Sequence, residues 1–294
     1  MTSARTTELE PAAAVIARWI DQSDRVVIGA GSGLSVAAGL DFGDQADFAA
    51  RFPALVKRGL KAAYEMISHS DLPPAAFWGF WAMHVNQMRF ADGRSPVYET
   101  LRGLVARKDR FVLTSNVDAM FARNGFDPDS IWSIQGDYAF MQCLRPCTTE
   151  VWPSAPVLAR ALEAIDPETQ EVADPDRIPR CIRCGGAVFM NVRGGRWFVE
   201  EPYHAQAERW QRWFGGSPNE RLLLMEIGAG FNTPGVIRWP MEQIATKLPT
   251  ARLVRINLRD ARVPRELGER ALSVSSGARE AIEALARVSP SRCS

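Results

Sequence analysis

The sequence lacks an excess of charge of either sign. Its 35 Lys and Arg residues are balanced by 34 Asp and Glu residues, which gives a formal net charge of +1. The basic residues are scattered along the chain rather than clustered, so no global field would recruit a polyanion. We therefore expect no nucleic-acid partner.

Long apolar runs are also missing. No stretch approaches the roughly 18 consecutive apolar residues that a membrane-spanning helix needs. The first residues, MTSARTTELEPAAAVIARWIDQ, begin too polar and follow too helical a period for a secretory signal. These absences predict a cytoplasmic protein with no membrane partner.

Cysteine is sparse, with five residues in 294. In a cytosolic chain, closely spaced cysteines indicate metal binding rather than disulfides. Four of them form two pairs, Cys143 with Cys147 (CLRPC) and Cys181 with Cys184 (CIRCGG). The second pair has the spacing of a zinc knuckle, and the first is one residue wider. We predict a structural Zn²⁺ held by four thiolates with no open coordination position; the alternative is a degenerate site without metal.

Short apolar strands followed by polar or glycine-rich turns recur along the chain. In RVVIGAGSGLSVAAGLDF, Val26 to Ile28 form an apolar run without polar alternation, and a glycine turn and a helix-compatible stretch follow. Similar strands are expected in RFVLTSN, IWSIQGD, RLLLMEIGAG, ARLVRINL and SVSSG. The pattern predicts an α/β fold: a Rossmann-like, doubly wound parallel sheet with a small inserted zinc-binding module and a helical insertion.

Changes of composition along the chain predict the domain boundaries. Residues 1–140 and 191–294 are expected to form the Rossmann-like domain, with the helical insertion at about 44–92, and residues 141–190 the zinc-binding module. Helices are expected over 8–21, 48–90 with a break at Pro73-Pro74, 95–108, 116–125, 235–248 and in AREAIEALARV.

The first glycine turn (Gly29 to Gly33) indicates a nucleotide site. Glycines at 29, 31 and 33 let the backbone approach a pyrophosphate closely, and the helix that follows offers N–H groups to it. Ser35 is placed for a hydroxyl contact. The alternative is a tight turn whose glycines only allow packing against the sheet.

The second glycine turn (Gly228 to Thr233) follows a strand far downstream and contains Gly228, Ala229, Gly230, Asn232 and Thr233. Both turns would open at the carboxyl ends of strands in one sheet, where ligands bind. Asn257, directly after the strand LVRI, fits the same edge. It either binds ribose hydroxyls or caps a turn.

Polar side chains cluster after two other strands: Thr114, Ser115, Asn116 and Asp118, then Gln135 and Asp137. Each taken alone could be a helix N-cap with an acid in its first turn. Because they leave the same expected sheet edge as both glycine turns, we interpret them as part of one site.

These motifs together resemble the sirtuin family, NAD-dependent enzymes with a Rossmann-like large domain and a small zinc-binding domain. GSGLSVAAGLDF (Gly31 to Phe42) is similar to the family pattern G-A-G-x-S-x-x-x-G-I-P-D-F, and TSNVD (Thr114 to Asp118) to T-Q-N-x-D. GAGFN loosely matches the G-T-S turn, and Asn257 the asparagine after the late strand. The likeness spans about Arg25 to Ala286.

The resemblance implies NAD as the cosubstrate and assigns further residues to its site. These are the neighbours of the turns and motifs already described: Ala30, Ser32, Gly39, Asp41, Phe42, Ser115 and Leu258.

Departures from the family pattern narrow the resemblance. The proline before the D-F pair is missing, Gly43 replaces the arginine that usually follows, and the H-G dipeptide with the general base is here Gln135-Gly136. With these changes the chain resembles the macrodomain-linked (class M) sirtuins. That branch implies protein ADP-ribosylation of a lipoylated carrier similar to the glycine-cleavage H protein, and a macrodomain hydrolase that acts on the product. It also implies that Arg193, in NVRGGRWFVEE, contributes to the active site.

A glutamine in place of the base selects between reactions. Asn116 and Asp118 could orient NAD for loss of nicotinamide, which leaves as a neutral molecule and needs no acid or base. Deacylation needs a base for a ribose hydroxyl, and losing it would cost on the order of 10²–10⁴ in rate. The sequence therefore predicts an ADP-ribosyltransferase with Asn116, Asp118, Gln135 and Arg193 as catalytic residues. The alternatives are an NAD-dependent deacylase or NAD hydrolase, and an inactive NAD-sensing module.

Overall fold

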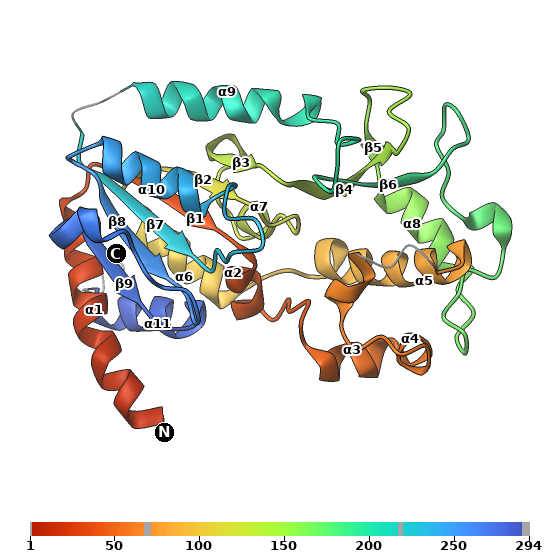
Figure 1. Ribbon diagram of the computed structural model, residues 1–294, viewed down its shortest axis with the longest axis horizontal. Helices are drawn as coiled ribbons and strands as arrows, with labels where there is room; N and C mark the ends of the chain where they lie inside the picture. Colours follow the sequence, from red (N-terminus) through yellow and green to blue (C-terminus); the bar gives the residue numbers. More distant parts are fainter. Residues whose placement is uncertain (1, 68–71, 217–219, 290–294) are drawn as a thin grey trace. The chain divides into compact units, whose positions relative to one another are not determined.

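The computed structural model describes residues 2–67, 72–216 and 220–289 (Figure 1). The chain divides into two compact units. The first unit contains Met1–Gly39, Gly93–Gln135 and Tyr203–Ser294, and the second contains Leu40–Asp92 and Gly136–Pro202. Within the described residues, no helix combines the length and apolar character that crossing a membrane requires.

The first unit is built on a six-stranded parallel sheet in the order β3-β2-β1-β7-β8-β9. If the six strands of this sheet are numbered from one to six along the chain, their order is 3-2-1-4-5-6, which is typical of a doubly wound dinucleotide-binding sheet. The strands β1 and β7 are buried over their whole length because helices cover both faces, which explains why most of their residues are apolar. The strand bounds are β1 Arg25–Ala30, β2 Asp109–Thr114, β3 Ile131–Ser133, β7 Leu222–Ile227, β8 Arg252–Ile256 and β9 Ala271–Val274. The predicted fold class is confirmed.

Helices cover the two faces of this sheet (Figure 1). On one face α1 contacts β9, and α11 contacts α1, α2 and α6. On the other, residues of α10 and α9 join a core cluster with Phe111, Leu224 and Leu253 of the strands. The helix bounds are α1 Thr2–Gln22, α2 Ser32–Ala37, α6 Pro96–Leu104, α7 Met120–Arg123, α9 Glu201–Gly215, α10 Arg238–Lys247 and α11 Ala278–Val288, with short 3-10 turns η3 Pro128–Ser130 and η5 Arg265–Arg270.

Two sequence predictions in this unit are wrong at their ends. The helix expected over 116–125 is only α7, because Ala119 has a left-handed φ of 55° that a continuous helix cannot contain. The strand expected over 131–137 ends at Ser133. Gln135 therefore lies outside β3, immediately before Gly136, whose φ is 95°. A site residue at 135 sits on a turn rather than on a strand.

The second unit combines helices with a three-stranded antiparallel sheet in the order β5-β4-β6. The sheet runs from Gly136 to Val192 and so extends past the range 141–190 expected for the cysteine module. The expected break at Pro73-Pro74 appears as the start of α5. Element bounds are α3 Gln45–Arg51, α4 Pro53–Lys57, η1 Ala63–Ile67, α5 Pro74–Val85, the π-helical η2 Asn86–Phe90, β4 Gly136–Cys143, β5 Trp152–Pro153, α8 Ala155–Leu162, η4 Pro175–Arg177 and β6 Val188–Val192.

Candidate functional site

The two glycine turns pack directly on each other at the carboxyl edge of the first unit's sheet. The Gly31 N–H donates to Ile227 O and the Gly33 N–H to Gly228 O, both at 3.0 Å. A Cβ at Gly31 would lie 2.6 Å from the Ala229 Cα, and one at Gly33 would lie 2.7 Å from the Gly228 Cα. Only glycine allows this approach. The glycines are therefore required for turn packing, and this packing also brings both turns to one place.

Residues next to the first glycine turn occupy the end of β1 and the length of α2. Gly29 and Ala30 are the last residues of β1, and α2 begins at Ser32. Gly39, with φ of 89°, follows α2. Ser115 lies opposite: its N–H and hydroxyl both donate to Ala30 O, at 3.0 and 3.3 Å. The expected neighbours of the turn therefore lie around the junction of β1 and β2.

Asn116, Asp118 and Ser35 form a buried polar cluster beside the first glycine turn. The Ser35 hydroxyl donates to Asp118 Oδ2 at 2.5 Å, and the Asp118 Oδ1 accepts from the Met120 N–H at 3.0 Å. Asn116 Nδ2 donates to Gly31 O at 3.0 Å. Asn116 is 8% and Asp118 5% exposed. The structure thus brings together residues that the sequence places more than 80 positions apart.

Tyr98, on α6, belongs to this cluster and was missed by sequence reasoning. It is fully buried, and its hydroxyl has no hydrogen-bond partner among the described residues, although it is close enough to Ser35, Asn116 and the Asp118 charge for them to affect its pKa. Burial and the Asp118 charge raise the pKa of Tyr98 well above its usual range, and contacts with Ser35 and Asn116 oppose this only in part. The stretch PVYETLRGL has an ordinary amphipathic pattern, so it contains no signal that separates this tyrosine from a core residue.

Asn257 acts in the structure as a turn residue that also supports the second glycine turn. Its Oδ1 accepts from the Arg259 and Asp260 N–H groups, both at 3.0 Å, and its Nδ2 donates to Ala229 O at 2.9 Å. Asn257 therefore caps the turn that follows β8, as one of the two sequence interpretations expected. Its side-chain amide also holds the backbone of the second glycine turn. Nearby residues predicted to bind NAD are open to solvent: Gly230, Asn232, Thr233 and Leu258.

A buried charge network lies beneath these loops. Glu226 on β7 makes a bidentate pair with Arg255 on β8, with both N–O distances at 2.7 Å and both side chains 0% exposed. Arg238 on α10 donates to Asp260 O at 2.9 Å and to Arg262 O at 3.2 Å, and lies 4.3 Å over the Phe231 ring. The network ties the second glycine turn to the loop after β8. No pattern in the sequence indicates this network.

The side-chain carbonyl oxygen of Gln135 accepts no hydrogen bond from the described residues. The residue is half-buried, and its Oε1 has no hydrogen-bond partner among the described residues although that atom is itself buried. The preceding Ile134 N–H donates to Thr114 O at 3.0 Å, which anchors the turn to the end of β2. An orphaned buried carbonyl implies a donor from a ligand or water.

The remaining predicted site residues belong to the second unit. Asp41 Oδ1 accepts from the Gly43 N–H at 2.7 Å, and the Phe42 ring meets His84 edge-on at 4.8 Å. Arg193 forms an ion pair with Glu200 and lies 4.5 Å over the Phe198 ring. Their assignment to the NAD site stays a prediction.

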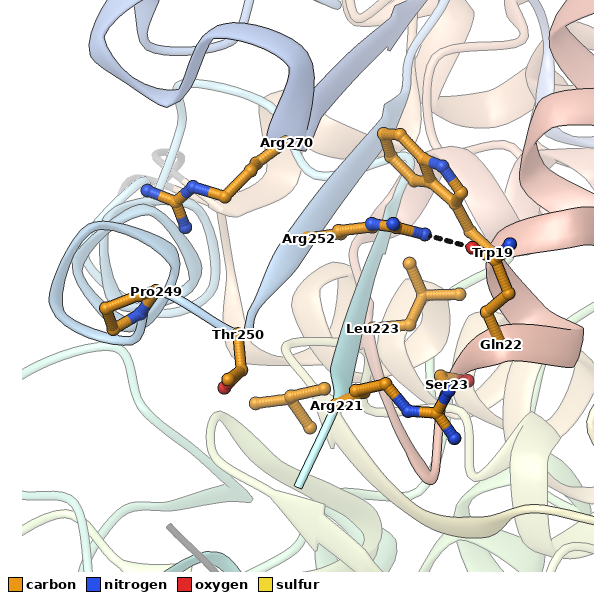
Figure 2. Close-up of a pocket in the computed structure, with 10 residues that line it drawn as sticks. Trp19, Gln22, Ser23, Arg221, Leu223, Pro249, Thr250, Arg252 and Arg270 are labelled. Carbon is orange, nitrogen blue, oxygen red and sulfur yellow. Dashed lines mark hydrogen bonds between the residues drawn. The ribbon is translucent and has the colours of Figure 1, made fainter. Parts of the chain in front are cut away.

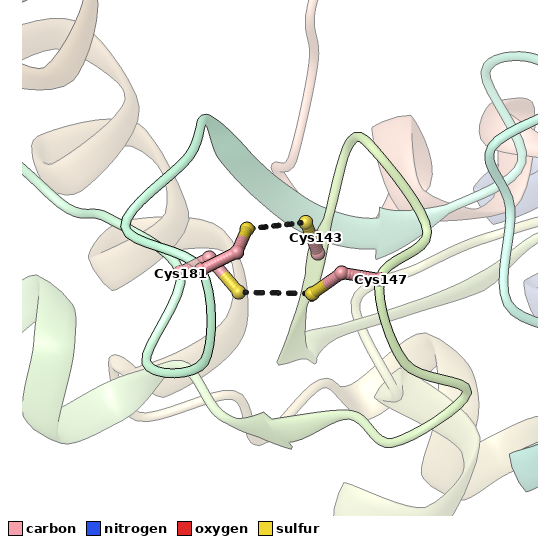
Figure 3. A group of neighbouring side chains, drawn as sticks. Cys143, Cys147 and Cys181 are labelled. Carbon is pink, nitrogen blue, oxygen red and sulfur yellow. Dashed lines mark hydrogen bonds between the residues drawn. The ribbon is translucent and has the colours of Figure 1, made fainter.

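The four cysteines form a cluster in the second unit (Figure 3). The Sγ atoms of Cys143 and Cys184 are 3.7 Å apart, those of Cys147 and Cys181 3.6 Å, and all four lie within 4.8 Å of one another. A Zn–S distance of about 2.3 Å places the ligands of a tetrahedron about 3.8 Å apart. The donor set and spacing therefore fit a closed tetrahedral zinc site.

The thiols of the cluster differ in acidity. Burial acts to raise the pKa of Cys143, but the Cys147 and Arg145 N–H groups and the neighbouring thiols outweigh it and lower this pKa to about 7. Burial and the neighbouring thiols raise the pKa of Cys147 to about 12. Without metal, this cluster is therefore not fully ionised at neutral pH.

A pocket of about 480 Å³ lies elsewhere in the first unit, at the start of β7 and β8 (Figure 2). Three arginines line it, and each is held by acceptors of the same unit. Arg221 pairs with Asp24 at 2.6 Å, and Arg252 donates to Gln22 Oε1 at 2.6 Å. Arg270 donates to three carbonyl oxygens, those of Ala245, Leu248 and Ala251. Because it opens at the amino ends of the strands, this pocket is not the predicted nucleotide site.

Comparison with known proteins adds two relatives that are similar in sequence. A "probable bifunctional ADP-ribose hydrolase/ADP-ribosyltransferase" of Fusarium oxysporum f. sp. cubense is 36% identical over 263 residues, which cover 87% of this chain. The chain spans only 44% of that relative. A "protein ADP-ribosyltransferase" of Staphylococcus aureus is 26% identical over 271 residues, covering 90% of this chain and 83% of the relative. No family model matches the sequence.

Solved structures of Sir2 homologues match nearly the whole chain. One, in complex with ADP-ribose, gives a TM-score of 0.59 at 15% identity and covers 92% of this chain and 94% of the homologue. Another, in complex with NAD, gives a TM-score of 0.56 at 15% identity, with 92% and 91% covered. The resemblance seen in the glycine, asparagine and cysteine motifs is confirmed at the level of architecture. The chain therefore has the fold of the Sir2 enzymes, the sirtuins.

Proposed function

We propose that this protein is an NAD-dependent protein ADP-ribosyltransferase. The observation that carries the proposal is the amide of Gln135 at the position of the sirtuin base, in a chain that keeps the Asn116 and Asp118 cluster. Gln135 cannot accept a proton, whereas the cluster retains the groups that orient NAD. Both relatives carry "ADP-ribosyltransferase" in their names, which supports the same conclusion.

The residues at the carboxyl edge of the sheet fit NAD. The packed glycine turns expose backbone at the start of α2, and the buried Gln135 Oε1 needs a donor that a ribose hydroxyl would supply. We propose that NAD is bound by the predicted set: Gly29, Ala30, Gly31, Ser32, Gly33, Ser35, Gly39, Asp41, Phe42, Ser115, Asn116, Asp118, Gln135, Gly228, Ala229, Gly230, Asn232, Thr233, Asn257 and Leu258.

In the proposed reaction the bond between the ribose C1′ and the nicotinamide nitrogen breaks first. The bonding electron pair goes to the ring nitrogen, so nicotinamide leaves neutral and the positive charge develops on the ribose. The Asp118 carboxylate, held by Ser35 and the Met120 N–H, favours that charge electrostatically, and Asn116 orients the leaving group. A nucleophile of the acceptor then bonds to C1′ and loses its proton to solvent. Gln135 positions ribose hydroxyls but does not deprotonate them.

The acceptor proposed is a lipoylated carrier protein, with Arg193 contributing to the active site and a macrodomain hydrolase removing the product. The setting proposed is the cytoplasm. The ion pair of Arg193 with Glu200 and its stacking on Phe198 hold the guanidinium in a defined place, as such a role would need.

The experiment uses NAD labelled in its adenylate half. One set of tubes contains an acetylated peptide and another a lipoylated carrier protein. We expect label on the carrier and no O-acetyl-ADP-ribose. The Gln135→His variant should gain deacylation, and the Asn116→Ala variant should lose nicotinamide release with both acceptors.

Other outcomes select the other reactions. Efficient acetyl transfer by the wild type would return the chain to the deacylases, and label appearing only as free ADP-ribose would make it an NAD hydrolase. Binding of NAD without nicotinamide release would leave a sensing module. Each of these results contradicts the proposal.

We also propose that Cys143, Cys147, Cys181 and Cys184 hold one structural Zn²⁺. The site is in the second unit, where zinc would join the end of β4 to the segment before β6. Four thiolates leave no position for water, so the metal would stabilise the fold and take no part in transfer.

A further inference from the structure

The amino-end pocket, at the start of β7 and β8, has a basic lining that contains no acidic residue. Its charged side chains are those of Arg221, Arg252 and Arg270, and the rest of the lining is neutral. Lys108 lies directly behind, where its Nζ donates to a backbone carbonyl of the lining at 2.7 Å. Asp24 pairs with Arg221 and so offsets one of these charges. The pocket therefore keeps an excess of positive charge in a chain whose formal net charge is only +1.

Two of the arginines have no carboxylate partner within the part of the chain that the structure describes. Arg252 is half-buried, and its hydrogen bond goes from Nη1 to the neutral amide oxygen of Gln22 at 2.6 Å. Arg270 is also half-buried, and Nη1 alone makes its hydrogen bonds, all to backbone carbonyls. The Nε and Nη2 groups of both side chains donate to none of the described residues. Since cations withdrawn from water are usually paired, these two guanidinium groups favour an anion supplied by a ligand.

The pocket also presents an apolar surface beside these donors. Its volume is about 480 Å³, which is in the range of small-molecule sites. The Arg252 guanidinium lies 5.1 Å over the ring of Trp19, and Figure 2 shows the Arg252 side chain pointing toward Trp19 and Gln22. Leu223 and Pro249 add to the apolar lining. A ligand whose anionic group pairs with Arg252 would therefore meet apolar side chains with the rest of its body.

The donors suit a phosphate group. Guanidinium groups bind phosphate with pairs of parallel hydrogen bonds, and a phosphate monoester has three acceptor oxygens and nearly two negative charges at neutral pH. We propose that the amino-end pocket is a binding site for a small phosphate monoester, with the phosphate on Arg252 and Arg270 and the organic part against Trp19. The site does not depend on the proposed function, because both glycine turns lie at the opposite, carboxyl edge of the sheet.

Two of the arginines also support the fold, and this decides which one to substitute. Arg270 Nη1 donates to the carbonyls of Ala245 and Leu248, at the end of α10. Arg221, at the start of β7, is held by the carboxylate of Asp24. Arg252 bonds only to Gln22, whose side chain is exposed. Substitution of Arg252 therefore removes a donor to the ligand at the least cost to the fold.

The test is calorimetric titration of the full chain with phenyl phosphate at pH 7.5 and low salt. We expect one site per chain, with binding that weakens as NaCl is raised. Arg252→Gln should raise the Kd at least about tenfold, as for loss of hydrogen bonds to a charged group. Arg287→Gln removes the same charge from α11, where the side chain is half exposed, and should bind like the wild type.

A second variant keeps every arginine. Thr250 is exposed and lines the pocket, so Thr250→Glu places a carboxylate among the guanidinium groups and should abolish binding of phenyl phosphate. Far-UV circular dichroism checks that each variant is folded. Absence of binding to the wild type would overturn the proposal, as would binding that persists in folded Arg252→Gln or Thr250→Glu.

Three further titrations identify what is recognised and where. Phenol, which lacks the phosphate, should not bind, and inorganic phosphate should bind more weakly than phenyl phosphate because it leaves Trp19 uncovered. Binding of phenol, or equal affinity for inorganic phosphate, would overturn the assignment to a phosphate monoester. Saturating NAD should leave the affinity for phenyl phosphate unchanged. Displacement by NAD would overturn the proposal, because the probe would then occupy the nucleotide site.

Discussion

His84 gives the sharpest prediction of how stability depends on pH. It lies on α5 at 1% exposure, stacked on Phe80 at 5.0 Å and met edge-on by Phe42 at 4.8 Å and Trp81 at 5.6 Å. Neither ring nitrogen has a hydrogen-bond partner among the described residues. Burial, assisted by the charge of Arg51, lowers the pKa of His84 to about 3. The folded protein therefore holds this imidazole neutral.

The magnitude follows from the difference between the folded and unfolded pKa values. In the unfolded chain the imidazole titrates near 6.5, so between about pH 6.5 and pH 3 the unfolded state binds the extra proton. The free energy of unfolding is fully retained above pH 6.5 and falls as pH decreases through this window. At 1.36 kcal/mol per pH unit, about 2 kcal/mol should be lost between pH 7 and pH 5.

The assay is urea unfolding followed by tryptophan fluorescence at pH 7 and pH 5, for the wild type and His84→Leu. We expect the difference in unfolding free energy between the two proteins to change by about 2 kcal/mol in favour of the variant at pH 5. His204→Leu, at an exposed histidine of α9, should follow the wild type. Parallel loss of stability in the wild type and His84→Leu would refute the reasoning, because the buried imidazole would then not control this limb.

Three further predictions concern the metal cluster, the glycine turns and the buried charges. Elemental analysis should find no zinc in Cys184→Ser, whereas Cys293→Ser, outside the described residues, should keep it. Zinc affinity should fall as pH drops below 7, because protons then compete for the thiolates. Gly33→Ala should weaken NAD binding at least tenfold by calorimetry, since its Cβ meets the other glycine turn, whereas Gly103→Ala, with nothing within 4 Å, should bind normally. Glu226→Gln should lower the free energy of unfolding by about 1.5–3 kcal/mol in urea, because the buried Arg255 loses its bidentate carboxylate partner and is left with Glu242 at 2.8 Å; a loss below about 0.5 kcal/mol would contradict this.

Much of the sheet could be predicted because its strands have a local signature. Val26 to Ile28 read as an apolar run without alternation, and the structure buries β1 completely between two helical layers. The glycine turn that follows is equally local. Strand order depends on pairings such as β1 with β7, almost 200 residues apart, and no short motif encodes that. The three-stranded sheet of the second unit was missed for the same reason.

The candidate site was predictable only where chemistry and spacing coincide. The cysteine pairs satisfy both, and the structure brings all four sulfur atoms together. The sequence alone left two roles open for Asn257, ribose binding and turn capping. In the structure its contacts with Arg259, Asp260 and Ala229 show the capping role. Tyr98 gave no signal because a buried aromatic at helical spacing is the usual content of a core.

The two residues of the Gln135-Gly136 dipeptide are constrained differently: the backbone conformation requires glycine at 136 but sets no such requirement at 135. Gly136 has a φ of 95°, and a Cβ there would overlap the backbone carbonyl of Asn191. Glycine at 136 is thus fixed by the fold whatever reaction is performed, and its retention says nothing about catalysis. Position 135 carries no such constraint, because its backbone neither takes a left-handed angle nor continues β3. The backbone at position 135 therefore accepts either a histidine or a glutamine. Gln135→His should leave the fold unchanged, so a gain of deacylation in that variant would report on the side chain alone.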